Sequence, residues 1–187
     1  MAAAAGDDDT SPPELRLNVV CTGNICRSPT ASVMLEAKLA AAGLGRRVEV
    51  VSCGIEGEAG MGADERTAAV ARARGYARID QHVAAQLQPA AHIAGCHLLL
   101  ACDTGHLAHL QRVAGPHKVR LLCAYARGRF RGASMPDPWY GSGTDFEHVA
   151  DMCEAATDGL VEAVAAALAT ADPAAALLAA AARDAGR

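Results

Sequence analysis

The sequence predicts a three-layer α/β/α domain around a four-stranded, parallel, twisted sheet. Short apolar runs alternate with amphipathic segments along the chain, and this alternation is typical of a parallel sheet covered by helices on both faces. The run 96–102 is apolar nearly throughout, as expected of a strand buried on both faces. The length of 187 residues suits one domain with an ample core. A ligand site is expected beyond the carboxyl ends of the strands.

The first strand and the first helix follow each other closely. Residues 15–21, LRLNVVC, have the apolar content of a strand with a buried end. The segment 28–43 has a helix-start signature, with Ser28 as the predicted N-cap and Pro29 at the first helical position, and Gly43 stops it. The loop between them therefore lies at the carboxyl edge of the predicted sheet.

The rest of the chain is predicted to supply three more strands and three more helices. Their patterns place strands at 46–54, 96–102 and 117–125. In the segment 63–76, acidic residues in the first turn and arginines near the end match the helix dipole. The remaining helices are expected at 103–115, closed by Gly115, and at 146–170.

Composition and charge limit the possible partners. The start MAAAAGDDDTSPPE has no basic flank before its short apolar run, so it is a poor secretory signal. No run reaches the ~18 apolar residues of a membrane span, and a net charge of −4 gives no field that would attract nucleic acid. We predict a cytoplasmic monomer with no nucleic-acid or membrane partner. It has a disordered lead over 1–14, one domain over 15–170 and an Ala-rich tail or frayed helix over 171–187.

Seven cysteines are spread along the chain. Their number is odd, and most lie in apolar runs such as HLLLACD and VRLLCAY. A disulfide scaffold is not expected in a chain of this length without an export signal. Most of these thiols are therefore interpreted as reduced, buried, small hydrophobic side chains.

The string CTGNICRS between the first strand and the first helix has the residues of an anion-binding loop. Successive backbone N–H groups in such a loop can converge on an anion, and the following helix dipole adds a positive end. Gly23 is expected to supply a positive φ, and Arg27 offers a planar fork for two phosphate oxygens. These groups favour a thiolate at Cys21, which would be a nucleophile. The alternative is an ordinary strand–helix turn.

A second candidate segment is MPDPWYG, which surrounds Asp137. Prolines on both sides stiffen the backbone, and a carboxyl group there could protonate a leaving oxygen and later deprotonate a water molecule. Trp139 and Tyr140 would form an aromatic wall for a flat substrate. Taken alone, the segment would be a proline-rich surface turn.

The motif VVCTGNICRSP resembles the phosphate loop of the low-molecular-weight protein tyrosine phosphatases. Three other stretches are similar to the same family: ADERTAAVARARGY followed by HVAAQL, HLLLACDTGHLAHLQRV with Asp103, and MPDPWYGSGTDFEHV. The similarity runs from about Leu15 to about Leu168. The resemblance implies hydrolysis of phosphotyrosine-containing protein substrates, with no cofactor and no metal.

The resemblance also assigns roles to residues. Cys21 would form a phosphocysteine, Arg27 would bind the phosphoryl oxygens, and Asp137 would be the general acid and base. Three residues would support the loop: Ser28 by stabilising the thiolate, Asn24 by holding the strained shape, and His82 by bracing Asn24. Substrate and phosphate binding would involve Thr22, Gly23, Asn24, Ile25, Cys26, Ser28, Trp139 and Tyr140.

Two features bear on substrate choice. The resemblance associates Ile25 with phosphotyrosine and a threonine at that position with phosphoarginine, and an apolar side chain suits a phenyl ring better than a guanidinium. The loop SCGIEGEAGMGADER departs from the family pattern, because the usual aromatic residue is missing and Glu58 stands near its place. We therefore expect weaker selectivity for aryl phosphates, with a phosphoarginine phosphatase as an alternative.

Two other functions are possible for a protein with this loop: an arsenate reductase and a phosphate-binding module. A thioredoxin-coupled arsenate reductase would need two further cysteines about seven residues apart, but His109 stands seven residues after Cys102, and Cys96 lies on the wrong side. A phosphate-binding module without catalytic activity would lack the nucleophile or the acid, whereas this sequence has both Cys21 and Asp137.

Cys26 lies five residues from Cys21. It is predicted to trap an oxidised nucleophile as a reversible disulfide, and the alternative is that Cys26 only packs at the start of the helix.

Two further patterns are interpreted as solvent-exposed surface rather than as functional sites. His106 and His109 have an HxxH spacing on a predicted helix, but without a nearby carboxylate they are typical of a solvated face rather than a metal site. The segment RGRFRG, 127–132, is predicted to be a solvated basic loop that at most steers anionic substrates.

Overall fold

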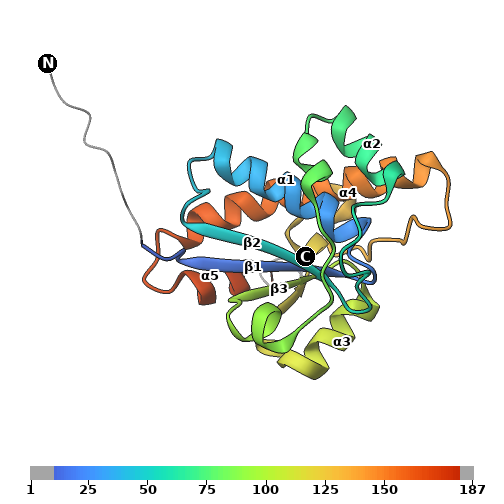
Figure 1. Cartoon of the computed structure of the whole chain (residues 1–187). Helices are drawn as coiled ribbons and strands as arrows, with labels where there is room; N and C mark the ends of the chain where they lie inside the picture. Colours follow the sequence, from blue (N-terminus) through green and yellow to red (C-terminus); the bar gives the residue numbers. More distant parts are fainter. Residues whose placement is uncertain (1–10, 182–187) are drawn as a thin grey trace, which may run out of the picture.

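The computed structural model describes residues 11–181, so most of the predicted disordered lead lies outside the described residues. The sheet has four parallel strands in the order β2-β1-β3-β4 (Figure 1). Its strands are β1 (Leu15–Cys21), β2 (Val48–Gly54), β3 (Leu98–Ala101) and β4 (Val119–Leu121). The helices are α1 (Arg27–Ala41), α2 (Glu65–Ala73), α3 (Thr104–Ala114), α4 (Gly143–Ala167) and α5 (Pro173–Ala180).

The two sides of the central strand β1 bury different cores. Leu15, Leu17 and Val19 pack in a large cluster with residues of α1 and α4, whereas Val20 belongs to a second cluster with Leu110 of α3. This alternation follows from the two-residue period of a strand. The result is the predicted three-layer arrangement, with α1 and α4 on one face of the sheet and α3 on the other (Figure 1).

The strand register brings several loops to one edge. Cys21 at the end of β1 pairs with Gly54 at the end of β2, and Val20 pairs with Ala101 at the end of β3. Because all strands run parallel, the segments that follow them emerge at the same edge. Short helical turns complete the connections, at Ala77–Gln81, Pro89–Ala94, Pro116–Lys118, Leu122–Tyr125 and Gly128–Phe130.

Several predicted element boundaries need correction. Helix α1 begins at Arg27 with Cys26 as its N-cap residue, so Ser28 is not the cap; its side chain serves the loop instead. The strand predicted over 117–125 is shorter because Leu122–Tyr125 coils into a 3-10 turn. Helix α4 begins before Phe146, where Ser142 and Asp145 form a capping box.

The tail contributes a packed helix. Within 171–187, residues Pro173–Ala180 form α5, and Leu177 is 1% exposed in the large core cluster. The Tyr125 hydroxyl donates a hydrogen bond of 3.0 Å to the Leu177 carbonyl. Residues 182–187 lie outside the described part. In the described range, no helix combines the length and apolarity needed to cross a bilayer.

Candidate active site

The nucleophile candidate Cys21 lies at the bottom of the loop between β1 and α1, and its exposed fraction is 2%. Its Sγ lies 2.9 Å from Ser28 Oγ, and the Asn24 backbone N–H donates to Sγ over 3.3 Å. The Ser28 oxygen already accepts from Asn24 Nδ2 at 2.8 Å, so its own proton is free to point at sulfur. Both contacts hold the Cys21 sulfur in place at the bottom of the loop.

The loop is held in shape by Asn24. Among residues 11–181, it is the non-glycine residue with a positive φ, 59°. The predicted positive φ at Gly23 is therefore wrong: the strained position is one residue later, and asparagine tolerates it. The fully buried Asn24 side chain also donates 3.0 Å to Ser52 Oγ and accepts 2.8 Å from Ala85 N. His82 Nε2 lies 2.7 Å from the Asn24 carbonyl, and burial lowers the His82 pKa.

Arg27 is 3% exposed and is held by three side chains. Its Nη1 donates to Asp103 Oδ2 at 2.8 Å, and its Nη2 donates to Thr22 Oγ1 at 3.1 Å and Asp137 Oδ2 at 2.6 Å. Burial alone lowers the Arg27 pKa, but nearby thiols and carboxylates outweigh it and raise that pKa overall. The buried Nε has no hydrogen-bond partner in the described part of the chain. A phosphoryl oxygen would supply one.

The segment after β2 lines the other side of the loop. Its backbone amides donate to the loop's carbonyls in order along the chain: Ile55 to Cys21, Glu56 to Thr22, Glu58 to Gly23 and Asp64 to Ile25, at 2.8 to 3.0 Å. Gly54 has no room for a side chain, because a Cβ atom there would lie 2.3 Å from the Thr22 carbonyl oxygen. The loop is thus locked by backbone contacts as well as by Asn24.

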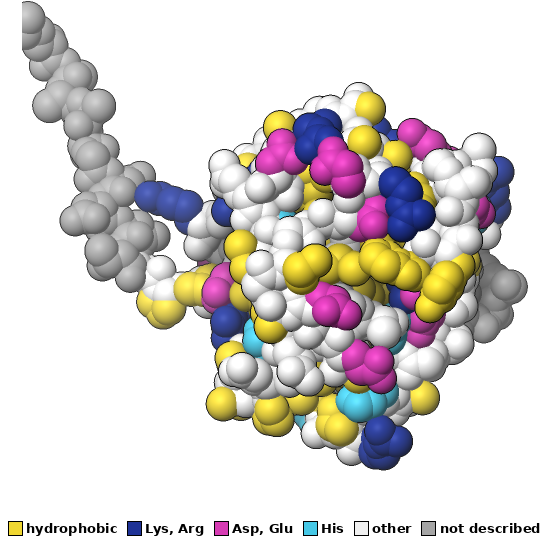
Figure 2. All heavy atoms as spheres, turned by 45° about the vertical axis from the view of Figure 1, so that its right-hand side comes forward, with side chains coloured by type: hydrophobic (Ala, Val, Ile, Leu, Met, Phe, Trp, Pro, Cys, Tyr) yellow, Lys and Arg dark blue, Asp and Glu magenta, His cyan; other side chains and the backbone are white. Residues whose placement is uncertain are grey.

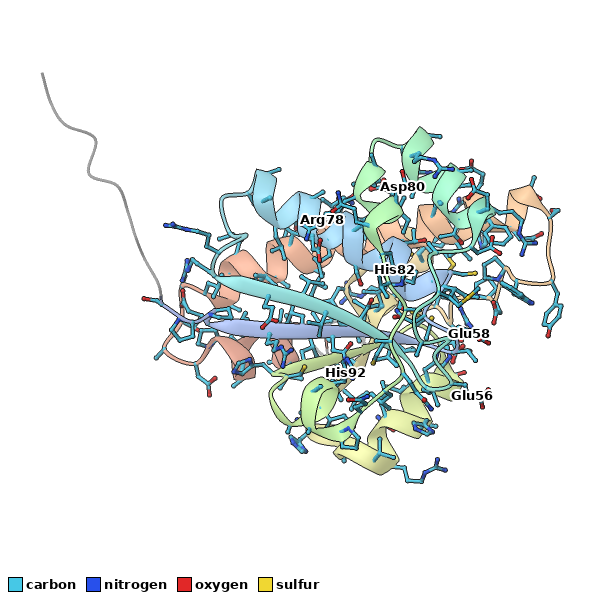
Figure 3. All side chains as sticks on the ribbon, in the orientation of Figure 1. Glu56, Glu58, Arg78, Asp80, His82 and His92 are labelled. Atoms are coloured by element: carbon cyan, nitrogen blue, oxygen red, sulfur yellow. The ribbon has the colours of Figure 1, made fainter. Side chains whose placement is uncertain are left out.

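A pocket of about 440 Å³ opens above the loop. Figure 2 shows apolar side chains in a band across this face, with acidic side chains beside it. Figure 3 shows Glu56 and Glu58 beyond the carboxyl ends of the strands, where the pocket lies. The pocket is lined by Cys21, Thr22, Gly23, Ile25, Cys26, Arg27, Glu56, Glu58, Met61, Asp137, Trp139 and Tyr140.

The acid candidate Asp137 lines this pocket and contacts Arg27 directly. Its Oδ2 binds Arg27, its Oδ1 accepts from the Trp139 N–H at 3.2 Å, and its side chain is 43% exposed. Trp139 is 41% exposed and Tyr140 94% exposed at the pocket mouth. The Arg66 guanidinium lies over the Trp139 ring, 5.5 Å from its centroid, in a cation–π contact.

Helix α3 contributes more to the site than its sequence predicts. His106 is 5% exposed, so its interpretation as part of a solvated face is wrong. Its Nε2 lies 2.9 Å from Thr22 Oγ1 and its Nδ1 lies 3.0 Å from Asp103 Oδ2. Asp103 also caps α3 by accepting from the His106 N–H. The signal available in the sequence was the position of Asp103 and His106 directly after a buried strand.

Cys26 lies in the same loop as Cys21 and is 5% exposed. Burial raises its pKa to about 12, which keeps it a neutral thiol near neutral pH. None of the seven cysteines forms a disulfide bond.

Cys102 directly follows β3 and is fully buried, and burial raises its pKa well above the usual range. The described residues contain no group of three or more His, Cys, Asp or Glu side chains suited to a metal ion.

The basic segment 127–132 lies apart from the pocket. Arg127 forms an ion pair with Glu162 of α4, and Phe130 packs edge-on against His148 with ring centroids 5.6 Å apart. Neither residue lines the pocket described above. The predicted attraction of anionic substrates by this segment would therefore act only through its long-range charge.

Fold and site together define an α/β protein that presents a cysteine and an arginine on the loop between β1 and α1. A family model described as low molecular weight phosphotyrosine protein phosphatase matches residues 16–170. A low molecular weight protein-tyrosine-phosphatase of Streptomyces coelicolor is 43% identical over 155 residues, which cover 80% of this chain and 93% of that protein. The chain therefore belongs to the low molecular weight phosphotyrosine protein phosphatase family.

Solved structures agree with this assignment. The tyrosine phosphatase AmsI of Erwinia amylovora is 30% identical with a TM-score of 0.69, covering 79% of this chain and 91% of that chain. The YwlE arginine phosphatase of Geobacillus stearothermophilus is 28% identical with the same TM-score of 0.69 and the same coverage, 79% and 91%. The fold alone therefore does not choose between phosphotyrosine and phosphoarginine.

Proposed function

We propose that the chain hydrolyses phosphotyrosine monoesters in proteins through a phosphocysteine on Cys21. The observation that carries the proposal is the arrangement of Cys21 Sγ at the bottom of a pocket that also contains Arg27 and Asp137. This arrangement gives a nucleophile, an anion clamp and a proton donor in one place. Protein tyrosine phosphatase relatives support the substrate class.

The proposed reaction has two steps. The Cys21 thiolate attacks phosphorus while Asp137 gives its proton to the departing phenol oxygen, so that the ester P–O bond breaks and an S–P bond forms. A water molecule then attacks the phosphocysteine and gives a proton to Asp137, releasing inorganic phosphate and the thiolate. Arg27 stabilises the phosphoryl oxygens in both transition states. A bound phosphate would compete with Asp137 for Arg27 Nη2, which frees the carboxyl group to take up its proton.

The pocket wall supports phosphotyrosine over phosphoarginine. Ile25, Met61, Trp139 and Tyr140 give the pocket an apolar side that fits a phenyl ring. Glu58 adds a carboxylate near the place where family members have an aromatic residue, so the preference for aryl esters should be weaker than with a complete aromatic wall. A clear preference of kcat/KM for a phosphoserine peptide over the matched phosphotyrosine peptide would contradict the assignment.

A thioredoxin-coupled arsenate reductase is not favoured. That chemistry must pass a disulfide outward, but Cys102 is fully buried and its raised pKa keeps it a thiol. His109 stands where a second relay cysteine would be needed. Arsenate-dependent thiol oxidation, measured against p-nitrophenyl phosphate hydrolysis, separates the two activities and also an idle phosphate-binding module.

The decisive experiment compares p-nitrophenyl phosphate hydrolysis by the wild type, Cys21→Ser and Asp137→Ala. We expect no turnover from Cys21→Ser, because serine lacks a thiolate. Asp137→Ala should lose about 10²–10⁴-fold in kcat, the usual contribution of a positioned general acid. Full activity of Cys21→Ser would refute the mechanism, and wild-type kcat in Asp137→Ala would remove Asp137 from its role.

We further infer that the enzyme works in a reducing, cytoplasmic environment and that Cys26 protects the nucleophile from irreversible oxidation. The unpaired state of all seven cysteines supports the first inference. The position of Cys26 in the loop with Cys21 supports the second. Peroxide would oxidise the Cys21 thiolate to a sulfenic acid, and Cys26 would then displace water to form a disulfide. The monomeric state stays a prediction.

A further inference from the structure

Four side chains behind the phosphate loop form a ring of close polar contacts. Three of the contacts are hydrogen bonds, and the fourth, between His106 and Asp103, is a close approach in which His106 Nδ1 has no hydrogen-bond partner among the described residues. Arg27 Nη2 donates to Thr22 Oγ1 over 3.1 Å, and Thr22 Oγ1 lies 2.9 Å from His106 Nε2. His106 Nδ1 lies 3.0 Å from Asp103 Oδ2, which accepts 2.8 Å from Arg27 Nη1. Helix α3 supplies His106 and follows Asp103, so the ring joins the loop to an element on the other face of the sheet.

The two hydrogen bonds of the Thr22 hydroxyl in this ring have one consistent direction. Thr22 has a single hydroxyl proton, and its oxygen already accepts from Arg27. The proton is therefore available for His106 Nε2, which accepts it when the ring is neutral and carries its proton on Nδ1, facing Asp103. A protonated His106 would instead donate to Thr22 and leave the hydroxyl proton without this acceptor. Burial lowers the His106 pKa to about 4, which keeps the neutral form at ordinary assay pH.

We propose that His106 is a positioning residue for phosphate binding, acting through the Thr22 hydroxyl on the Arg27 guanidinium. Two of the three guanidinium nitrogens are tied by Asp103, Thr22 and Asp137, and the buried Nε has no partner in the described residues. Fixing the guanidinium plane fixes the direction of the Nε–H as well. Groups that stabilise a transition state act best when they are held before the substrate arrives.

The alternative is a histidine that merely fills space beside α3. The two roles depend on different properties of the side chain at position 106. A space-filling role needs volume, which leucine supplies. A positioning role needs an acceptor near the Nε2 site, which the glutamine side-chain oxygen can reach, whereas the shorter asparagine remains near the Nδ1 site.

The experiment measures competitive inhibition by inorganic phosphate, together with kcat and KM for p-nitrophenyl phosphate, in His106→Gln, His106→Asn and His106→Leu. We expect His106→Asn and His106→Leu to weaken phosphate inhibition and raise KM roughly 5–20-fold, the usual effect of losing one hydrogen bond that supports a charged group. His106→Gln should remain within about 3-fold of the wild type. His109→Leu on the same helix is the matched control, because His109 contacts Arg112 rather than the loop.

A double-mutant cycle of Thr22 and His106 supplies the second measurement. If His106 acts through Thr22, the effects of Thr22→Val and His106→Leu on phosphate inhibition will not add in the double variant. Additive effects, or equal inhibition constants in His106→Gln and His106→Asn, would overturn the inference. If His106→Leu does not fold, the comparison of the glutamine and asparagine variants decides alone. A wild type that phosphate does not inhibit would count against the proposed function itself.

Discussion

At the residue scale, Glu58 places an acidic residue in the lining of the pocket. Its backbone N–H donates to the Gly23 carbonyl at 3.0 Å, and Glu58 lines the pocket together with Glu56. The Glu58 side chain also packs near Gly23, since a Cβ atom at Gly23 would lie 3.7 Å from Glu58 Cγ. An acidic wall beside an anion-binding loop should repel acidic residues that flank the phosphotyrosine.

Replacing Glu58 by glutamine tests this repulsion. We expect Glu58→Gln to raise kcat/KM roughly 3–10-fold for phosphotyrosine peptides with acidic neighbours, about the effect of one screened charge pair. Peptides with lysine neighbours should gain nothing or lose slightly, and the difference should shrink at high salt. Glu49→Gln is the control, because it makes the same charge change on β2, where Glu49 pairs with Arg16. Equal gains for both peptides would exclude an electrostatic role.

Cys26 defines a second prediction at the residue scale. Its pKa of about 12 means that the reactive thiolate is scarce near neutral pH, so trapping of an oxidised Cys21 should become faster as pH rises. After peroxide treatment, reductant should restore the wild type more fully than Cys26→Ser, while Cys96→Ser should behave like the wild type. Equal recovery by Cys26→Ser would show that Cys26 only fills space at the start of α1.

At the element scale, α3 links the stability of the fold to the state of His106. The folded-state pKa of about 4 lies below the ordinary 6.5, so the unfolded chain binds this proton first as pH falls. The resulting stabilisation is complete above pH 6.5 and is lost as pH falls toward 4. Besides the desolvation that lowers this pKa, the groups acting on it are Asp103 and Asp137, which raise it, and Arg27 and His109, which lower it.

The corresponding measurement is the free energy of unfolding in urea between pH 7 and pH 4. The wild type should lose more stability over this range than His106→Gln, which has no proton to bind at this position. His82 and His92 also have lowered pKa values, but they are present in both proteins and cancel in the comparison. Parallel curves for the two proteins would mean that His106 is not held neutral by the fold.

At the scale of the whole molecule, α5 is part of the core although it lies far from the pocket. Figure 1 shows α5 near the amino-terminal end of β1, whereas the loop that carries Cys21 and Arg27 lies at its carboxyl end. Leu177 is 1% exposed and packs in the same cluster as α4. Helix α5 therefore stabilises the domain without lining the pocket.

Truncation of the Leu177 side chain should separate stability from activity. We expect Leu177→Ala to lower the free energy of unfolding by about 2–5 kcal/mol, the usual cost of a buried leucine cavity. The kcat for p-nitrophenyl phosphate below the unfolding transition should not change. Leu178→Ala, at a partly exposed position of the same helix, should cost less. Equal costs for the two variants would mean that α5 does not dock through Leu177.

Local periodicity, turn residues and motif spacing suffice to predict the α/β class, the order of the elements and the loop that carries Cys21 and Arg27. Tertiary structure decided what no local pattern contains. It placed the positive φ at Asn24, whose side chain must reach Ser52 and Ala85 from distant segments. It also buried His106 behind the loop, because the solvent exposure of a helix face depends on what packs against it.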